Sequence, residues 1–141
     1  MRNELKIKLY SFTIDCIDPD ELASFYAALL HWVIVFSSQE YVVVAPAQTH
    51  QGGYPSLTFQ RNPDFRPPVW PDTPEKQQQM AHLDFAVTLL EKAVAHAVNC
   101  GASLAKEQFS DHWRVMIDPS GHPFCFVQMK ALMESEHFAL L

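Results

Sequence analysis

The first half of the chain predicts a strand, a helix and three further strands. Apolar and polar residues alternate over residues 9–16, as in a half-buried strand. Asp18, Pro19 and Glu21 then predict an N-cap, a first helical residue and a capping-box partner. The apolar helix positions recur at i, i+3, i+4, i+7 and i+8, namely Leu22, Phe25, Tyr26, Leu29 and Leu30. Runs rich in β-forming residues follow at 32–36, 41–45 and 56–60, and Gly52 and Gly53 mark the turn before the last.

The second half repeats this order. A strand is predicted at 82–87, followed by a capping box of Thr88 and Glu91 and a helix that Gly101 closes. Its apolar stripe comprises Leu90, Ala93, Val94, Ala97 and Val98. Strands are predicted at 103–106, 113–117 and 123–128, with a turn at 118–121 before the last. Ser11 and His82 are 71 positions apart, Tyr41 and Trp113 are 72, and Ser56 and Cys125 are 69, which indicates an internal duplication.

The predicted fold class is therefore α+β, with two βαβββ modules pairing into an open curved mixed sheet. We expect one domain over residues 1–141: a first module at 9–60, a linker at 61–79, a second module at 80–128 and a tail at 129–141. The linker carries five prolines, too many for a helix or a central strand. Trp70 within it is expected to pack back on the domain, where it could line a cup.

Splitting the outer strands of each module by parity gives two different faces. One is apolar and is expected to be covered by the helices: Phe12, Ile14, Leu57, Phe59, Leu83, Phe85, Phe124 and Phe126. The other carries mostly short polar side chains: Ser11, Thr13, Asp15, Ser56, Thr58, His82, Asp84, Cys125 and Val127. Lys, Arg and Glu are absent from this second face, which favours a concave, partly enclosed polar surface over an ordinary solvated one.

Charge and cysteine content narrow the class of partner. The net charge is −6 and the ten Lys and Arg form no basic run, so neither nucleic acid nor an anionic membrane is an expected partner. Three cysteines and a charged N-terminus without an apolar core predict a cytoplasmic protein. The sequence holds no Gly-rich phosphate loop, G-x-S-x-G, C-x-x-C or H-E-x-x-H motif. A small molecule is therefore the expected partner.

Several segments resemble the vicinal oxygen chelate superfamily, which includes glyoxalase I, extradiol dioxygenases and bleomycin-resistance proteins. They are Ile17-Asp18-Pro19 with Phe25-Tyr26, residues 82–87, and residues 113–125 with the Asp118-Pro119-Ser120-Gly121 turn. Within the superfamily the chain looks closest to uncharacterised glyoxalase-like domain proteins. The resemblance implies four metal-ligand places, which fall at Ser11, Ser56, His82 and Cys125. Serine hydroxyls are weak ligands, so we predict no metal and no cofactor.

The predicted ligand-binding residues are seven residues of the polar face and two aromatic residues: Ser11, Thr13, Ser56, Thr58, His82, Asp84, Trp113, Cys125 and Trp70. His82 could instead be a metal ligand, a general base or a structural residue held by Asp84 or Ser11. Cys125 is expected to be an inert thiol rather than a nucleophile. Asp84 could hold His82, Arg114 or a cationic ligand, or could point into water.

Three functions are compatible with these residues, and catalytic residues are not assigned. The first is a metal-free cup that sequesters a partly aromatic compound or antibiotic, as bleomycin-resistance proteins do. The alternative is a metal-dependent lyase, isomerase or dioxygenase of the glyoxalase type. The third is a metal-free enzyme with His82 and Asp84 as acid and base. The resemblance and the apolar residues of the linker and tail also predict a homodimer.

Overall fold

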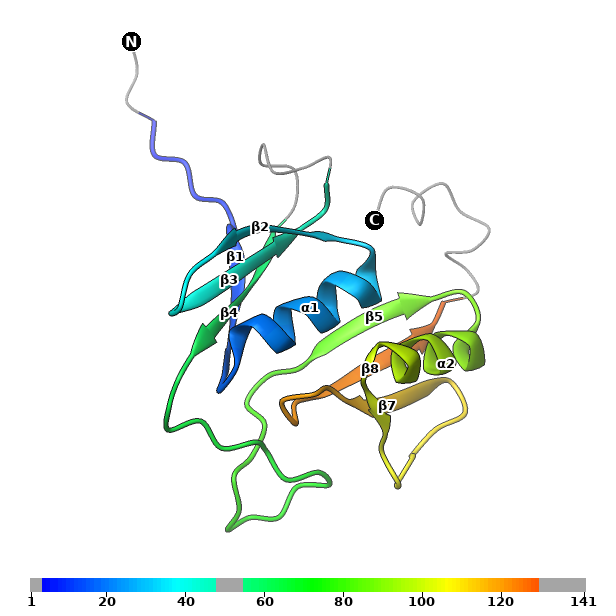
Figure 1. Cartoon of the computed structure of the whole chain (residues 1–141). Coiled ribbons are helices and arrows are strands. Elements are labelled where there is room, and N and C mark those ends of the chain that lie inside the picture. Colours follow the sequence, from blue (N-terminus) through cyan, green and yellow to red (C-terminus); the bar gives the residue numbers. More distant parts are fainter. Residues whose placement is uncertain (1–3, 48–54, 130–141) are drawn as a thin grey trace. The chain divides into compact units, whose positions relative to one another are not determined.

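The computed structural model describes residues 4–47 and 55–129, in two compact units that comprise residues 1–65 and 66–141 (Figure 1). Each unit holds one four-stranded sheet and one helix. The order of elements is strand, helix and three strands in both, as the duplication predicts. Among the described residues, no helix has both the length and the apolar character needed to cross a membrane. That the two modules form one domain stays a prediction, and the predicted turn at Gly52 and Gly53 lies outside the described residues.

The sheet of the first unit has the order β1-β4-β3-β2. Its elements are β1 (Ser11–Cys16), α1 (Pro19–Leu30), β2 (Val33–Ser37), β3 (Tyr41–Ala45) and β4 (Ser56–Arg61). Strands β1 and β4 are parallel, with Ser11 beside Ser56 and Thr13 beside Thr58, whereas the other neighbours are antiparallel. The two outer strands of the sequence module are therefore direct neighbours in space.

Helix α1 begins as its sequence predicts. The Asp18 side chain accepts a hydrogen bond from the Glu21 amide at 3.1 Å, and Pro19 occupies the first turn. Its apolar stripe packs on β3 and β4, where the ring of Tyr26 stacks on Phe59 at 5.2 Å between centroids. Tyr26 and Phe59 are both almost fully buried, so this contact forms the centre of the first core.

The second unit has the equivalent order β5-β8-β7-β6 (Figure 1). Its elements are β5 (Leu83–Val87), α2 (Leu90–Cys100), β6 (Ser103–Leu104), β7 (Trp113–Ile117) and β8 (Pro123–Gln128). Strands β5 and β8 are parallel, and β7 is antiparallel to both β8 and β6. The rings of Phe85, Phe124 and Phe126 contact one another on one face of this sheet and form its core.

Three details differ from the sequence predictions. The N-cap of α2 is Leu89, without a side-chain bond, so the predicted Thr88–Glu91 capping box is wrong, although Gly101 closes the helix as expected. Strand β6 is two residues long instead of four. Phe12, predicted to be in the core, is 48% exposed. Its strand β1 is an edge strand, with a neighbouring strand on one side only.

The turn between β7 and β8 explains one glycine. The Asp118 carboxylate is buried and accepts hydrogen bonds from the amides of Ser120 and His122, at 3.0 and 2.9 Å. Gly121 has a φ of 96°, and a Cβ there would lie 2.6 Å from Cβ of Pro67. Only glycine suits both the backbone angle and the close approach of the proline segment.

Candidate functional site

The second sheet brings three predicted site residues together. Asp84 on β5 and Cys125 on β8 are direct neighbours in register, so their side chains lie on the same face. His82, which immediately precedes β5, places its Nε2 3.3 Å from Oδ1 of Asp84. The candidate ligand atoms of these three residues all lie within 4.8 Å of one another. We call these three residues the His82 cluster.

Trp113 extends this face with an aromatic ring. It pairs with Val127 on β8, two residues beyond Cys125, so both residues share the face of the His82 cluster. Val115, directly beside Cys125, is buried there, whereas Trp113 is 39% exposed at the end of its strand. The face therefore combines a polar cluster with an exposed aromatic side chain.

The electrostatics of the His82 cluster keep its thiol protonated. Burial is the largest cause that raises the pKa of Cys125 to about 11, followed by the negative charge of Asp84 and a hydrogen bond to that carboxylate. A thiol with such a pKa is almost wholly neutral at pH 7 and is a poor nucleophile. This supports the prediction of an inert cysteine and gives Cys125 the role of a hydrogen-bond donor to Asp84.

The donor set can be tested against a metal ion. Imidazole, carboxylate and thiolate are the three ligand types of zinc sites, and three ligand atoms within 4.8 Å need only a small contraction to surround an ion at about 2.0–2.3 Å. The residues thus fit a three-ligand site, with Asp84 as the ligand added to His82 and Cys125. Asp84 is not among the four ligand places that the resemblance implies, so the prediction of no metal, which rested on the two serines, did not count it.

In the first sheet the polar residues at the equivalent positions are hydroxyl side chains that bond within the sheet. Ser11 Oγ lies 2.7 Å from Oγ1 of Thr58 and donates to the Ser56 carbonyl at 3.1 Å. Ser56 Oγ donates to the Tyr10 carbonyl at 3.3 Å. Ser56 and Thr58 are buried, whereas Thr13 is exposed. The hydroxyls of Ser11, Ser56 and Thr58 are satisfied by one another and by the backbone. They offer no imidazole, thiol or carboxylate to an ion.

The structure therefore groups the predicted residues within each unit. It brings together Ser11, Ser56 and Thr58 in the first and His82, Asp84 and Cys125 in the second. The predicted convergence of the two groups in one cup stays a prediction. The Trp70 ring meets Phe109 edge to face at 6.1 Å between centroids, and its Nε1 is buried without a partner among the described residues. That Trp70 lines a cup stays a prediction.

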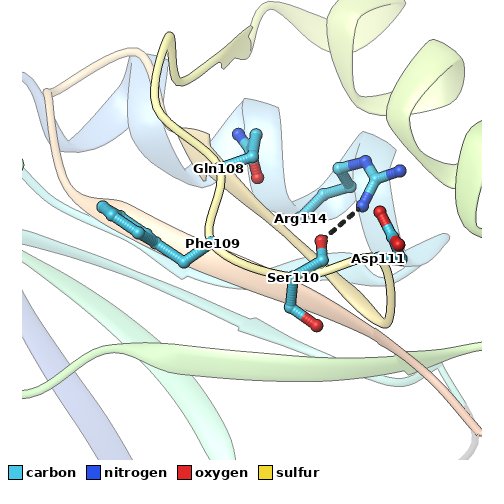
Figure 2. A pocket seen from close by; sticks show the side chains of 5 residues that line it. All are labelled: Gln108, Phe109, Ser110, Asp111 and Arg114. Atoms are coloured by element: carbon cyan, nitrogen blue, oxygen red, sulfur yellow. Dashed lines mark hydrogen bonds between the residues drawn. The ribbon is translucent and has the colours of Figure 1, made fainter.

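A hollow that the sequence did not indicate lies in the loop before β7 (Figure 2). It measures about 440 Å³ and is lined by Gln108, Phe109, Ser110, Asp111 and Arg114. Arg114 is paired with Phe126 on β8, so its side chain lies on the face opposite Cys125. Nothing in the sequence marks this loop, because it has neither a strand nor a helix period.

Comparison with known proteins agrees with this architecture. A crystal structure of a glyoxalase/bleomycin resistance protein/dioxygenase family enzyme from Burkholderia phytofirmans PsJN is similar, with 15% identity and a TM-score of 0.63 over 86% of this chain and 98% of that one. Glyoxalase I of Leishmania major, described as trypanothione-dependent, has 16% identity and a TM-score of 0.59 over 96% of each chain. TnmS3, an antibiotic-binding protein from Streptomyces sp. CB03234, has 14% identity and a TM-score of 0.57 over 89% of this chain and 98% of that one.

These structures share the fold at low identity and so establish the architecture alone. No curated protein matches the chain. The family model described as the glyoxalase-like domain matches residues 11–127, from the first residue of β1 to the penultimate residue of β8. The chain therefore belongs to the glyoxalase-like domain family of the vicinal oxygen chelate superfamily.

Proposed function

We propose that the protein binds a small, partly aromatic compound, without a metal ion, on the face that carries the His82 cluster and Trp113. The observation that carries this proposal is the combination on one face of a protonated thiol, a carboxylate–imidazole pair and an exposed indole. Polar groups of this kind orient a ligand, and an aromatic wall supplies most of its buried contact area. The antibiotic-binding neighbour is a further support from fold analogy.

Binding of a defined probe tests the proposal. Bleomycin, which contains an aromatic bithiazole, is titrated into the full chain while heat release and tryptophan fluorescence are followed, and a panel of smaller aromatic compounds is run in parallel. We expect at least one probe to bind, and Trp113→Ala to weaken it by about tenfold, the usual loss for an aromatic contact of this size. The control is Leu104→Ala, which removes a similarly exposed apolar side chain from β6. Equal losses in the two variants would contradict the proposal.

A metal-dependent lyase, isomerase or dioxygenase is the second candidate. The three ligand types of the His82 cluster within 4.8 Å favour it. A divalent ion held by His82, Asp84 and Cys125 would supply a Lewis acid for a carbonyl oxygen. If this candidate holds, adding ZnCl2 or NiCl2 to the full chain shifts or broadens the His82 imidazole signals in NMR spectra before those of His112, which is also exposed. Simultaneous effects on both histidines would speak against it.

Two further properties are proposed with this function. A homodimer is supported by exposed apolar side chains that one chain leaves uncovered, among them Leu5, Ile7 and Phe36 at 86%, 88% and 48% exposure and Met80 directly after the proline-rich linker. Its mass in solution at micromolar concentration tests this. A cytoplasmic location is supported by Cys16, Cys100 and Cys125, none of which forms a disulfide bond.

A further inference from the structure

The hollow before β7 has two polar walls that are already held in place (Figure 2). Gln108 donates from Nε2 to the carbonyls of Ala105 and Val115 and accepts from the Val115 amide, all at 2.9–3.0 Å. Arg114 donates from Nη1 to the carbonyls of Ser110 and Trp113, at 3.0 and 2.9 Å. Ordering these side chains costs a ligand nothing more, because the fold has already fixed them.

Arg114 retains hydrogen-bonding capacity. Its Nη2 binds Oε1 of Glu91 at 3.0 Å, and the Glu91 side chain is 75% exposed. The guanidinium has five N–H groups, of which the described contacts use three, so Nε–H and one N–H of Nη2 lack partners among the described residues. An exposed ion pair is worth about 0–1 kcal/mol, so a ligand can displace Glu91.

Asp111 and Phe109 complete the hollow with a second charge and an apolar surface. The Asp111 carboxylate has no hydrogen bond or ion pair within residues 4–47 and 55–129, and Figure 2 shows it on the same side of the loop as Arg114. The Phe109 ring lies toward the other end of the loop, is 61% exposed and contacts Trp70 edge to face. The hollow thus has a cationic group, an anionic group and an aromatic ring along its length.

We propose that this hollow binds a small zwitterion with an apolar side chain, such as a free α-amino acid or a compound that retains its ammonium and carboxylate groups. Arg114 binds the carboxylate, Asp111 binds the ammonium group, and Phe109 contacts the apolar part. A volume of about 440 Å³ falls within the usual size of small-molecule sites. The site is separate from the His82 cluster, because Arg114 and Cys125 lie on opposite faces of the sheet.

L-Phenylalanine is the probe that tests this site, with the isotope-labelled full chain observed by NMR. We expect a Kd of roughly 1 mM, and shifts confined to the amides of residues 108–114. Phenethylamine lacks the carboxylate and 3-phenylpropionate lacks the ammonium group. Each should bind at least about tenfold more weakly, since each lacks one of the two charged groups through which the zwitterion pairs with Arg114 and Asp111.

Three variants separate recognition from structure. Asp111→Asn is expected to weaken phenylalanine binding about tenfold, whereas Asp64→Asn, which removes the same charge from the first unit, leaves it unchanged. Arg114→Lys keeps the positive charge but loses the planar guanidinium that can bind a carboxylate through two N–H groups, so it should also weaken binding. Glu91→Gln removes the competing carboxylate and should tighten it about twofold to fivefold.

Three results would overturn the proposal: no shift in residues 108–114 at about 10 mM phenylalanine, equal binding by Asp111→Asn and Asp64→Asn, or binding of either truncated analogue as tight as that of phenylalanine. Shifts that map to His82 and Cys125 would also overturn it, and would assign the zwitterion to the other face. The outcome is independent of the metal-free site proposed above, because none of these variants alters the His82 cluster.

Discussion

The two sheets have the same strand order and the same parallel pairing of outer strands, yet they carry different chemistry at the same place. In the first, Ser11 and Thr58 are joined by a 2.7 Å hydrogen bond, and the hydroxyls are satisfied internally. In the second, Asp84 lies beside Cys125, and its Oδ1 is 3.3 Å from Nε2 of His82. Burial and the negative charge of Asp84 raise the pKa of the Cys125 thiol. Duplication of a fold therefore repeats the scaffold and leaves the chemistry of each copy to a few side chains.

The difference has a physical basis in what each side chain needs from its surroundings. Two hydroxyls can each donate and accept, so a neighbouring pair satisfies itself. A carboxylate can only accept, and it draws its partners from the donors nearby, here an imidazole and a thiol. Ser11, Ser56 and Thr58 of the first sheet accordingly find their hydrogen-bond partners within that sheet and the adjoining backbone, whereas the second sheet presents a carboxylate, an imidazole and a thiol side by side.

The largest effect is expected for a core residue of β8, the last strand of the second module. Phe124 on β8 is almost fully buried between two other rings, so Phe124→Ala should lower the free energy of unfolding by about 3–5 kcal/mol in urea titrations. Phe12→Ala is the control, because Phe12 lies on the edge strand β1 and its side chain is 48% exposed. Equal losses in the two variants would contradict the assigned cores.

A smaller effect tests the internal satisfaction of the first polar pair. Ser11→Ala removes the bond to Thr58 and leaves a buried hydroxyl without its partner, which should cost about 1–2 kcal/mol of unfolding free energy. Thr13→Ala is the matched control, since Thr13 is on the same strand face and exposed. An effect of Ser11→Ala as mild as that of the control would contradict a stabilising hydrogen bond between Ser11 and Thr58.

The smallest effect concerns the pH dependence that only the second sheet should show. The pKa of Cys125 is about 11 in the folded protein against an ordinary value of 9.0. The unfolded chain therefore releases this proton first, so the stabilisation is complete below about pH 9 and is lost as the pH rises toward about 11. The free energy of unfolding of Cys125→Ala should fall less steeply over this interval than that of the unaltered protein. If the free energies of unfolding of the two proteins fall in parallel between about pH 9 and 11, the pKa of Cys125 is not raised in the folded protein.

Much of the scaffold could be predicted from periodicity, because burial of one face imposes a period on each element. Parity placed Asp84 and Cys125 on one face and Phe124 and Phe126 on the other, as the register confirms. Parity also predicted that Phe12 is buried, which is wrong. A two-residue period shows which face a side chain is on, but it does not show whether the strand lies at the edge or in the middle of its sheet. It also failed for the start of α2, where local capping chemistry at Thr88 did not decide the boundary.

The chemistry of the sites was less accessible from the sequence. The distance between His82 and Asp84 depends on side-chain rotamers, and the pKa of Cys125 depends on burial, neither of which a parity argument specifies. The hollow was missed altogether because Phe109 and Asp111 belong to a loop without a period, and Arg114 joins them only through the fold of β7.

The central claim, that the second sheet binds its ligand without a metal, is tested most directly by elemental analysis. Tag-free protein is dialysed against Zn, Ni, Fe and Mn in turn and then against buffer alone, and the bound metal is counted per chain. We expect well below one ion per chain, with no difference between the unaltered protein and His82→Ala. Close to one ion per chain, removed by His82→Ala and retained by His112→Ala, would contradict it and would establish the metal-dependent candidate in its place.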